Sequence, residues 1–467
     1  MAEPIKVLFV SAEVTPFAKV GGLADVTGSL TKALRRLGQD GGKLGVRPDG
    51  MIVNTGAGPV AAGIYESTLP GSDVPIYFVA QQHLFDRPNV YGYDDDAYRF
   101  AFFSRAAFEL TNAIGWQPDV LHAHDWHTAP AVTWLATAGR GDPRYQAMPS
   151  VFTIHNLAHQ GRTSWDIFRY LGVITHGMGE EPYGSVNFMA RGIYHATMIN
   201  TVSPNYAREI MTPEGGSGLH TLLRFRHYDV HGILNCVDFE VFNPSTDPKL
   251  AQRFTAETLE ARAANKLALQ RQLGLPERPE IPLLGMVTRL DRQKGLDIVG
   301  HVVHLLMNGG AGEAQFVVVG TGDPGYEDMF RHLAGYHTDK LRAVLAFAPE
   351  IAQLVYGGSD MFLMPSLFEP CGLGQLIAMR YGSVPIVRAV GGLSDTVRNM
   401  TTGFLFDDFS AEALWHAVQR AIYIYNVDKG SWRALQRNGM QADFSWRNSA
   451  LGYQQLYEWA LARMRGW

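Results

Sequence analysis

The sequence predicts an α/β protein with two Rossmann-like domains that face each other. At 467 residues, the chain exceeds the length that one hydrophobic core usually serves. Short apolar runs suited to buried parallel strands alternate with segments of helical spacing, first in the N-terminal half and again in the C-terminal half. A polar stretch that contains proline, residues 243–248, separates the two series. Two series of strand–helix units with a hinge between them indicate two domains.

Composition and charge narrow the classes of function. Hydrophobic residues make up 46% of the chain and charged residues 18%, as expected for a folded enzyme. The net charge of −5 gives no basic field for nucleic acid or an anionic membrane, so neither is expected as a partner. Cys236 and Cys371 are too few for a disulfide framework. No signal-peptide pattern or membrane-spanning run is evident, so we expect a cytoplasmic protein.

The first strand, expected at residues 5–10, leads into a loop that suits phosphate binding. Gly21 and Gly22 at the start of the following helix let a diphosphate approach the backbone, where helix amides attract anions. Lys19 supplies a positive charge, and Glu13 supplies a hydrogen-bond acceptor. A tight strand-to-helix turn with a solvated lysine explains the same residues equally well, so both interpretations stay open at this point.

The next stretch, residues 38–71, is polar and rich in glycine where a second apolar strand is due. We expect it to be irregular. A strand follows at residues 74–80 and a helix at residues 95–114, with an acidic helix start that the helix dipole favours.

A later strand ends in the residues H-A-H-D-W-H, which raises the question of a metal site. His122 and His124 share one face of the strand, but His127 lies past a turn, and no zinc-site spacing accompanies them. We therefore expect no metal. A polar strand end at which Asp125 and Trp126 contact a sugar is the favoured interpretation.

Two further strands of the first series end in polar residues. The strand at residues 150–154 ends in His155 and Asn156, and a later one ends in Asn235. A single histidine at a strand end is often structural. Because the carboxyl ends of parallel strands meet at one edge of a sheet, several polar strand ends together favour a ligand site.

The second series has its strands at residues 282–288, 315–320, 341–347, 361–364 and 384–387, and the chain closes with helices at 410–426 and 446–465. The motif G-x-G-x-x-G occurs at residues 320–325. We interpret it as a tight turn, because a dinucleotide fingerprint normally opens the first strand–helix unit and Pro324 removes an amide from the phosphate-facing turn.

Charged residues at two strand ends of the second series suggest transfer of a group from a nucleotide sugar. Glu369 lies in a turn between a buried strand and a helix start, where a carboxylate is well aimed at sugar hydroxyls. Arg289 and Lys294 follow the first strand, where two cations can hold a diphosphate and stabilise its charge as it leaves. Solvated basic residues are the alternative.

Long motifs in order along the chain resemble those of the bacterial glycogen and starch synthases. They are K-V-G-G-L-A-D at 19–25, H-A-H-D-W-H at 122–127, F-T-I-H-N-L-A-H-Q-G at 152–161, T-V-S-P-N-Y-A-R-E-I at 201–210, R-L-D-R-Q-K-G-L-D at 289–297, E-P-C-G-L at 369–373 and G-G-L-S-D-T-V at 391–397. The resemblance implies a GT-B fold with a deep cleft between its domains. It also implies retaining transfer of glucose from ADP-glucose to the non-reducing end of an α-1,4-glucan such as glycogen, without metal or other cofactor.

The same resemblance implies the domain limits and the site. The domains would span residues 1–240 and 241–445, with a last helix at 446–467 that crosses back to the first domain. The implied catalytic residues are His155, Glu369, Arg289 and Lys294. The implied substrate-binding residues are Glu13, Lys19, Gly21, Gly22, Tyr91, Asp125, Trp126, Asn156, Asn235, Cys371, Gly372, Leu373 and Gly374.

The chain departs from the family pattern, and two alternatives stay open. The family usually has threonine at the position of Gly374, glycine at that of Cys236, and a clear second strand where this chain has a glycine-rich stretch. One alternative is a non-catalytic or weakly active glucan-binding paralogue, and the other is a glycosyltransferase that uses UDP-glucose. Gly374 and the irregular stretch are the hints for the first, and the second stays open because the sequence does not settle the nucleotide base. An epimerase or a phosphorylase is disfavoured, because no site for its base or its pyridoxal phosphate is evident.

Overall fold

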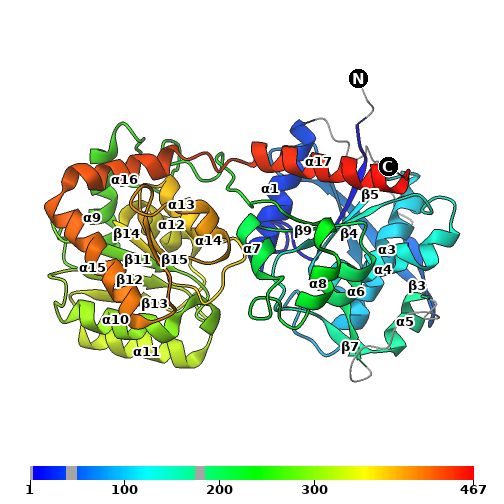
Figure 1. The fold of residues 1–467 in the computed structure, drawn as a ribbon, viewed down its shortest axis with the longest axis horizontal. Coiled ribbons are helices and arrows are strands. Elements are labelled where there is room, and N and C mark those ends of the chain that lie inside the picture. The colour runs from blue at the N-terminus through cyan, green and yellow to red at the C-terminus, as the bar shows by residue number, and fades with distance from the viewer. Residues whose placement is uncertain (1–3, 38–49, 174–184, 467) are drawn as a thin grey trace. The chain divides into compact units, whose positions relative to one another are not determined.

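The computed structural model describes residues 4–37, 50–173 and 185–466, which form two compact units (Figure 1). Unit 1 comprises Met1–Asn235 and Trp446–Trp467, and unit 2 comprises Cys236–Ser445. Each unit has its own parallel sheet with helices packed against it. Among the described residues, no helix is both long enough and apolar enough to cross a membrane.

The main sheet of unit 1 has five parallel strands in the order β1-β5-β6-β9-β10. These are β1 (Val7–Val10), β5 (Val120–His124), β6 (Ser150–Ile154), β9 (Met198–Thr201) and β10 (Val230–Gly232). Every residue of β5, β6 and β9 is buried. Because both faces are buried, these strands do not alternate apolar and polar residues. Among the polar side chains that they contain, His122, Thr153 and Asn200 are hydrogen-bonded to one another or to helix α17 (Trp446–Met464).

The helices of unit 1 come from both ends of the chain. They are α1 (Gly22–Arg36), α3 (Asp96–Ile114), α4 (Asp125–Ala136), α5 (Asp166–Leu171), α6 (Phe188–His195), α7 (Pro204–Glu209), α8 (His220–Phe225) and α17 (Trp446–Met464), with a short α2 (Gln82–Phe85). Helix α17 packs against α1 and against the strands β5, β6 and β9 (Figure 1). The last helix of the chain is thus part of the first unit.

A three-stranded antiparallel sheet lies in the region that was expected to be irregular. It consists of β2 (Met51–Thr55), β3 (Gly58–Thr68) and β4 (Pro75–Ala80). The prediction was therefore wrong for β2 and β3, which contain Gly, Pro and many exposed positions because only one face packs, against α3. Residues 38–49 of the same prediction lie outside the described residues. The small pair β7 (Arg162–Ser164) and β8 (Ser185–Asn187) completes the strands described in unit 1.

The sheet of unit 2 has six parallel strands in the order β13-β12-β11-β14-β15-β16. They are β11 (Leu283–Val287), β12 (Gln315–Val319), β13 (Leu341–Val344), β14 (Met361–Met364), β15 (Val384–Arg388) and β16 (Phe404–Phe406). The helices are α9 (Arg262–Gln272), α10 (Leu296–Met307), α11 (Pro324–Tyr336), α12 (Pro349–Gly358), α13 (Gly374–Arg380), α14 (Gly391–Thr396), α15 (Ala411–Val427) and α16 (Lys429–Gln441). The five predicted strands are present, whereas β16 and α16 were not predicted.

The G-x-G-x-x-G stretch forms a turn from β12 into α11. A Cβ atom at position 320 would lie 1.8 Å from the carbonyl oxygen of Thr288, and one at 322 would lie 2.4 Å from that of Leu290. Both positions therefore require glycine because the backbone after β11 passes too close for any side chain. Close backbone packing in the sheet of unit 2 therefore explains these two glycines of the motif.

Candidate functional site

The loop between β1 and α1 is held by a buried carboxylate. Glu13 Oε2 accepts hydrogen bonds from the amides of Val20 (2.7 Å) and Gly21 (2.9 Å), and Oε1 accepts one from the Tyr91 hydroxyl (3.2 Å). Lys19 Nζ pairs with Asp25 Oδ1 at 2.7 Å and is partly exposed. Glu13 thus shapes the loop that was expected to bind phosphate.

Helix α1 begins at two glycines directly after the amides that Glu13 holds. Gly21 is the N-cap residue and has no side chain to cap the helix, and Gly22 is the first residue of the helix. The amide of Gly21 itself donates to Glu13 Oε2. The N-terminus of a helix attracts anions through its free amides and its dipole. The local structure is compatible with phosphate binding beside Lys19.

Asp125 connects the ends of β5 and β6. It is the first residue of α4, it is buried, and its φ of 56° is unusual for a residue other than glycine. Its Oδ1 accepts hydrogen bonds from the amides of His155 (2.7 Å) and Asn156 (3.4 Å). Burial raises the pKa of Asp125 to about 7, although these two amides act in the opposite direction. The carboxyl group of Asp125 therefore changes its charge as the pH varies around neutrality.

His155 lies directly after β6, with its ring against a second histidine. The Nε2 atom of His155 and the Nδ1 atom of His124 are 3.0 Å apart, so one ring donates a hydrogen bond to the other. Burial lowers the pKa of His155 to about 3 and that of His124 well below its usual range. Both rings are neutral at physiological pH, and His155 therefore acts as a hydrogen-bonding group.

Aromatic rings surround this strand end. The ring of His127 stacks on Trp126 at 4.1 Å and lies 5.1 Å from that of Tyr91. Asn156 Oδ1 accepts a hydrogen bond from the amide of Ala158 at 3.1 Å. The structure thus brings together predicted site residues of unit 1: Glu13 with Tyr91, and Asp125 with His155 and Asn156. Asn235 is buried at the end of unit 1, and its backbone amide donates a hydrogen bond to the carbonyl of Val202.

His122 belongs to a buried polar network instead of a metal site. Its Nδ1 atom lies 2.8 Å from the hydroxyl of Tyr457 in α17, and its Nε2 atom lies 2.6 Å from Thr153 Oγ1. The network continues from Thr153 through Asn200 to Tyr453 of α17. Across the described ranges, no three His, Cys, Asp or Glu side chains form a group suited to a metal ion. The two tyrosines were not predicted, because nothing in the sequence links them to β5.

Unit 2 places Lys294 and Glu369 in direct contact. Lys294 Nζ lies 2.7 Å from Glu369 Oε2, which also accepts a hydrogen bond from Ser366 Oγ at 2.9 Å. Both charged side chains are largely buried. Arg289, whose side chain is 55% exposed, lies 3.3 Å from both Gln293 Oε1 and Asp291 Oδ2. The predicted cations therefore follow β11, and the predicted carboxylate follows β14, at the same edge of the sheet.

The backbone around Glu369 is fixed by close contacts. Gln293 holds two consecutive residues of the turn, since its carbonyl accepts the Leu367 amide (2.8 Å) and its Nε2 donates to the Phe368 carbonyl (3.3 Å). A Cβ atom at Gly391 would lie 1.8 Å from the carbonyl oxygen of Glu369. Sequence reasoning identified neither Gln293 nor Ser366 as a partner, because each contact depends on how two loops fold together.

The turn after Glu369 leads into α13. Cys371 is buried, Gly372 has a φ of 72°, and Leu373 is the N-cap residue of α13. Gln375 Nε2 donates to the carbonyl of Cys371 at 3.1 Å. A Cβ atom at Gly374 would lie 3.2 Å from Met364 Sδ and Phe362 Cε1, so a larger side chain requires these neighbours to move. These residues form a compact backbone support beside the Lys294–Glu369 pair.

Comparisons with known proteins cover both units. The family model "Starch synthase catalytic domain" matches residues 6–225, and "Glycosyl transferases group 1" matches residues 267–428. The chain is 41% identical to a glycogen synthase of Desulforudis audaxviator, covering 99% of this chain and 97% of that protein. It is 41% identical to one of Moorella thermoacetica, covering 100% and 99%. The catalytic domain of starch synthase IV from Arabidopsis thaliana, solved with ADP and acarbose, superposes with a TM-score of 0.90 at 34% identity, covering 98% of this chain and 100% of that one.

Proposed function

The chain belongs to the glycogen and starch synthase family, and from this premise we propose that it transfers glucose from ADP-glucose to the non-reducing end of an α-1,4-glucan, with retention. The family, the GT-B fold and the glycosyltransferase class predicted from the sequence are confirmed. The roles of individual residues and the exact domain limits stay proposals.

The buried pair of Lys294 and Glu369 carries this proposal. A lysine and a glutamate at the carboxyl ends of β11 and β14 offer both a cation for phosphate and an acceptor for sugar hydroxyls. In our proposal, Arg289 and Lys294 hold the diphosphate and stabilise the charge that develops as it leaves. Glu369, ordered by Ser366, orients the transferred glucose.

In our proposal, the acceptor hydroxyl attacks on the same face of the sugar, because the two buried carboxylates at these strand ends of unit 1 are engaged with backbone amides. A double displacement needs a carboxylate nucleophile. Glu13 and Asp125 are the buried carboxylates nearest the described strand ends, and both hold backbone amides. We therefore assign His155 the role of hydrogen-bonding a sugar hydroxyl, which its neutral ring suits.

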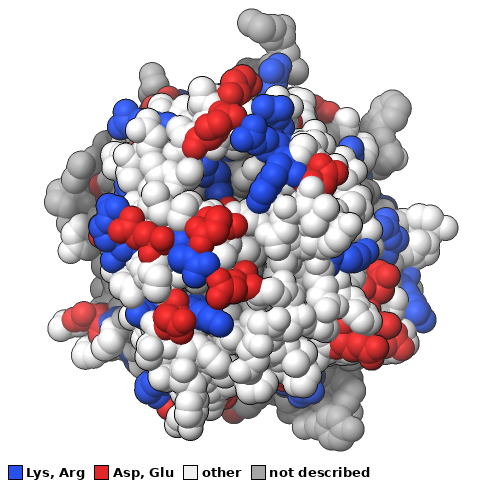
Figure 2. Space-filling model, turned by 90° about the vertical axis from the view of Figure 1, so that its left-hand side faces the viewer, with Lys and Arg blue, Asp and Glu red and all other residues white. Residues whose placement is uncertain are grey.

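The proposed partners are ADP-glucose and glycogen. Figure 2 shows acidic and basic side chains interspersed on one face of unit 2. Such a surface of mixed charge is compatible with a neutral glucan, whereas nucleic-acid binding favours a surface of positive charge. We propose a cytoplasmic protein, since its relatives are bacterial glycogen synthases and both cysteines are free thiols.

One transfer assay tests the proposed function. The full-length protein is incubated with glycogen and either ADP-glucose or UDP-glucose labelled in the sugar, and label in the polymer is measured. We expect incorporation from ADP-glucose, and a loss of about 10²-fold or more in Glu369→Gln. No incorporation with glycogen binding intact indicates the non-catalytic paralogue, and preferential use of UDP-glucose indicates the other alternative. Near-full activity of Glu369→Gln contradicts the assigned site.

A further inference from the structure

One glutamine joins the two loops that carry the proposed donor-binding residues of unit 2. Gln293 is the middle residue of a short 3-10 helical turn, Arg292–Lys294, between β11 and α10. Its side chain is partly buried and contacts both loops. The side-chain oxygen faces Arg289, which follows β11, and the side-chain nitrogen faces the turn that carries Glu369 after β14.

The two ends of the Gln293 amide meet partners of opposite chemistry. Its Oε1 accepts a hydrogen bond from Arg289 Nη2 at 3.3 Å, and its Nε2 donates one to the carbonyl of Phe368 at 3.3 Å. Because a guanidinium only donates and a carbonyl only accepts, one orientation of the amide satisfies both partners. A carboxylate at this position serves the guanidinium alone, and an apolar side chain serves neither.

The backbone of the same segment reinforces this link. The carbonyl of Gln293 accepts a hydrogen bond from the Leu367 amide at 2.8 Å. Gly295 has a φ of 74°, and a Cβ atom there would lie 2.0 Å from the carbonyl oxygen of Pro365. The loop after β11 and the turn after β14 therefore pack backbone against backbone.

Arg289 needs such a link more than Glu369 does. The side chain of Arg289 is 55% exposed, whereas that of Glu369 is 6% exposed and accepts a hydrogen bond from Ser366. An exposed arginine has many rotamers open to it, and fixing one of them costs conformational entropy. The contact with Gln293 favours one arrangement of the guanidinium before a substrate binds.

We propose that Gln293 is a positioning residue for sugar transfer, which holds Arg289 at a fixed place relative to the turn of Glu369. The inference rests on the proposed function, in which Arg289 holds the diphosphate of the donor and Glu369 holds its glucose. The bond that breaks joins these two groups, so a small error in their relative position raises the barrier. The bound donor still contacts both residues without Gln293, and the loss therefore falls on kcat more than on KM.

Steady-state kinetics of the full-length protein with ADP-glucose and glycogen test this role. Gln293→Met keeps the length of the side chain and removes both amide contacts. We expect kcat to fall by about tenfold or more, with KM changed by less than about threefold. The matched control Gln272→Met, at the exposed end of α9, should change neither constant. A kcat of Gln293→Met within about twofold of the wild-type value overturns the proposal.

Gln293→Glu distinguishes positioning from a need for any polar side chain. The carboxylate has the shape of the amide and keeps an acceptor for Arg289, but it has no hydrogen to donate to the Phe368 carbonyl. We expect kcat to fall as in Gln293→Met, and KM to rise as well, because the added negative charge opposes the diphosphate. Wild-type values of both constants in Gln293→Glu overturn the proposal.

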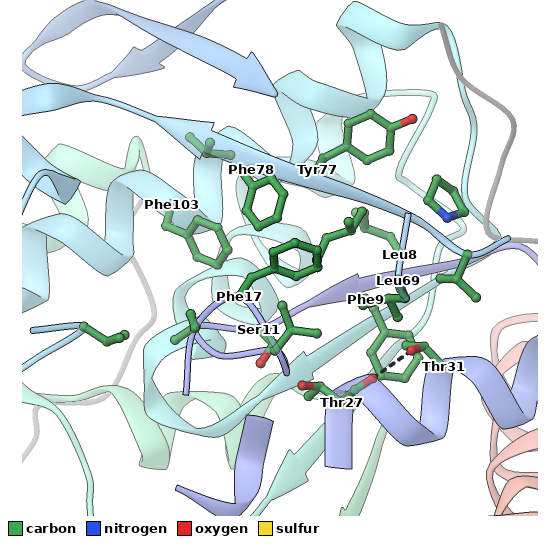
Figure 3. Close-up of a pocket in the computed structure, with 18 of the residues that line it drawn as sticks. Leu8, Phe9, Ser11, Phe17, Thr27, Thr31, Leu69, Tyr77, Phe78 and Phe103 are labelled. Atoms are coloured by element: carbon green, nitrogen blue, oxygen red, sulfur yellow. Dashed lines mark hydrogen bonds between the residues drawn. The ribbon is translucent and has the colours of Figure 1, made fainter. Parts of the chain in front are cut away.

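A destabilised variant of unit 1 separates the effect of position from that of stability. Leu69 is 2% exposed and lines the pocket of unit 1 drawn in Figure 3. Leu69→Ala removes buried methyl groups and should lower Tm, but kcat per mole of folded protein should keep its wild-type value. An equal loss of kcat in Leu69→Ala and Gln293→Met shows that activity follows stability, and this outcome overturns the positioning role.

Hydrogen exchange tests the link without any activity. Pro365 and Pro370 bracket the turn of Glu369 and carry no amide hydrogen, so residues 366–369 report on this turn alone. We expect Gln293→Met to speed exchange of the Leu367 amide by about fivefold, as the loss of a neighbouring hydrogen bond implies. Unchanged exchange overturns the link. No transfer by the wild-type protein refutes the proposed function instead, and exchange then decides alone whether Gln293 joins the two loops.

Discussion

At the scale of single residues, Asp125 combines an unfavourable environment with a positioning role. It is buried, it has a left-handed backbone conformation, and its carboxylate fixes the amide of His155. Such backbone conformations cost about 1–3 kcal/mol and persist where the surrounding structure enforces them, often at functional sites. Asp125 thus fixes the backbone at the end of β6, and this role lowers the free energy of unfolding.

Replacing Asp125 by asparagine should change how stability depends on pH. The folded pKa of about 7 lies above the reference value of 3.8, so the unfolded chain loses its proton first as pH rises. The contribution of Asp125 to the free energy of unfolding therefore falls from about pH 4 upward, and the fall is complete above about pH 7. Asparagine does not titrate, keeps the acceptor oxygen and tolerates a positive φ.

Urea unfolding of the wild-type protein and Asp125→Asn tests this expectation. The free energies of unfolding of the two proteins should differ little near about pH 4. Between about pH 4 and pH 7 the difference should grow by on the order of 1.4 kcal/mol per pH unit, so that the variant is more stable by a few kcal/mol near about pH 8. A difference that does not grow with pH would show that Asp125 ionises normally in the folded protein.

Lys294 offers a matched pair of variants for catalysis. Lys294→Ala should lower kcat/KM for ADP-glucose by about 10²-fold, because a cation that stabilises the leaving diphosphate is removed. The control is Arg292→Ala, two residues away, whose side chain is 77% exposed and pairs with Asp297. It should change kcat/KM by less than about threefold. Equal effects of the two variants in steady-state kinetics would refute the role of Lys294.

At the scale of elements, the sequence was most informative about the buried parallel strands. β12 and β14 are nearly continuous apolar runs because both of their faces are covered, and β5 and β6 are fully buried although they contain histidine, serine and threonine. His155 and Glu369 were correctly expected after buried strands. The β2–β3 hairpin was missed because one of its faces is largely exposed and its sequence contains glycine and proline.

Contacts between loops could not be predicted in the same way. Glu13 was expected to face a ligand, and the structure shows its carboxylate holding the amides of Val20 and Gly21. The direct pairing of Lys294 with Glu369 was likewise not predicted, because it depends on two turns that are distant in sequence. Pattern and spacing specify local structure, whereas these contacts depend on the path of each loop.

Gly391 provides a test of how closely α14 supports the Glu369 turn. Gly391→Ala should lower both thermal stability and kcat/KM, because the new Cβ would overlap the carbonyl oxygen of Glu369. The control is Gly335→Ala in α11, where nothing lies within 4 Å and helix propensity should add about 0.5–1 kcal/mol. Scanning calorimetry and the transfer assay report the two effects. An unaltered Gly391→Ala enzyme would contradict the tight support.

At the scale of the whole molecule, the chain forms two units that each bury their own core. Unit 2 is continuous in sequence, whereas unit 1 is completed by α17 from the C-terminal end. Tyr453 and Tyr457 of α17 are fully buried, and Tyr457 is hydrogen-bonded to His122. Unit 1 therefore depends on a segment that is separated from its sheet by the whole of unit 2 in the sequence.

Removing residues 446–467 should destabilise unit 1 selectively. The deletion exposes apolar surface on α1 and leaves the buried His122 without its tyrosine partner, which is costly for a buried polar group. Hydrogen exchange should accelerate in β5, β6 and β9 and stay unchanged in β11 and β12. Tyr457→Phe, which removes only the hydroxyl, should produce a smaller change in the same strands. Uniform acceleration in both units would contradict this division.

The position of α17 also has a consequence for synthesis on the ribosome. The strands of unit 1 leave the ribosome first, but the helix that covers them is translated only after all of unit 2. Unit 2 can complete its core as soon as Ser445 has emerged. Unit 1, by contrast, keeps apolar surface exposed to solvent until α17 has been translated. The nascent chain should therefore finish folding in the reverse of its translation order, and its N-terminal half should be the part that needs chaperone protection.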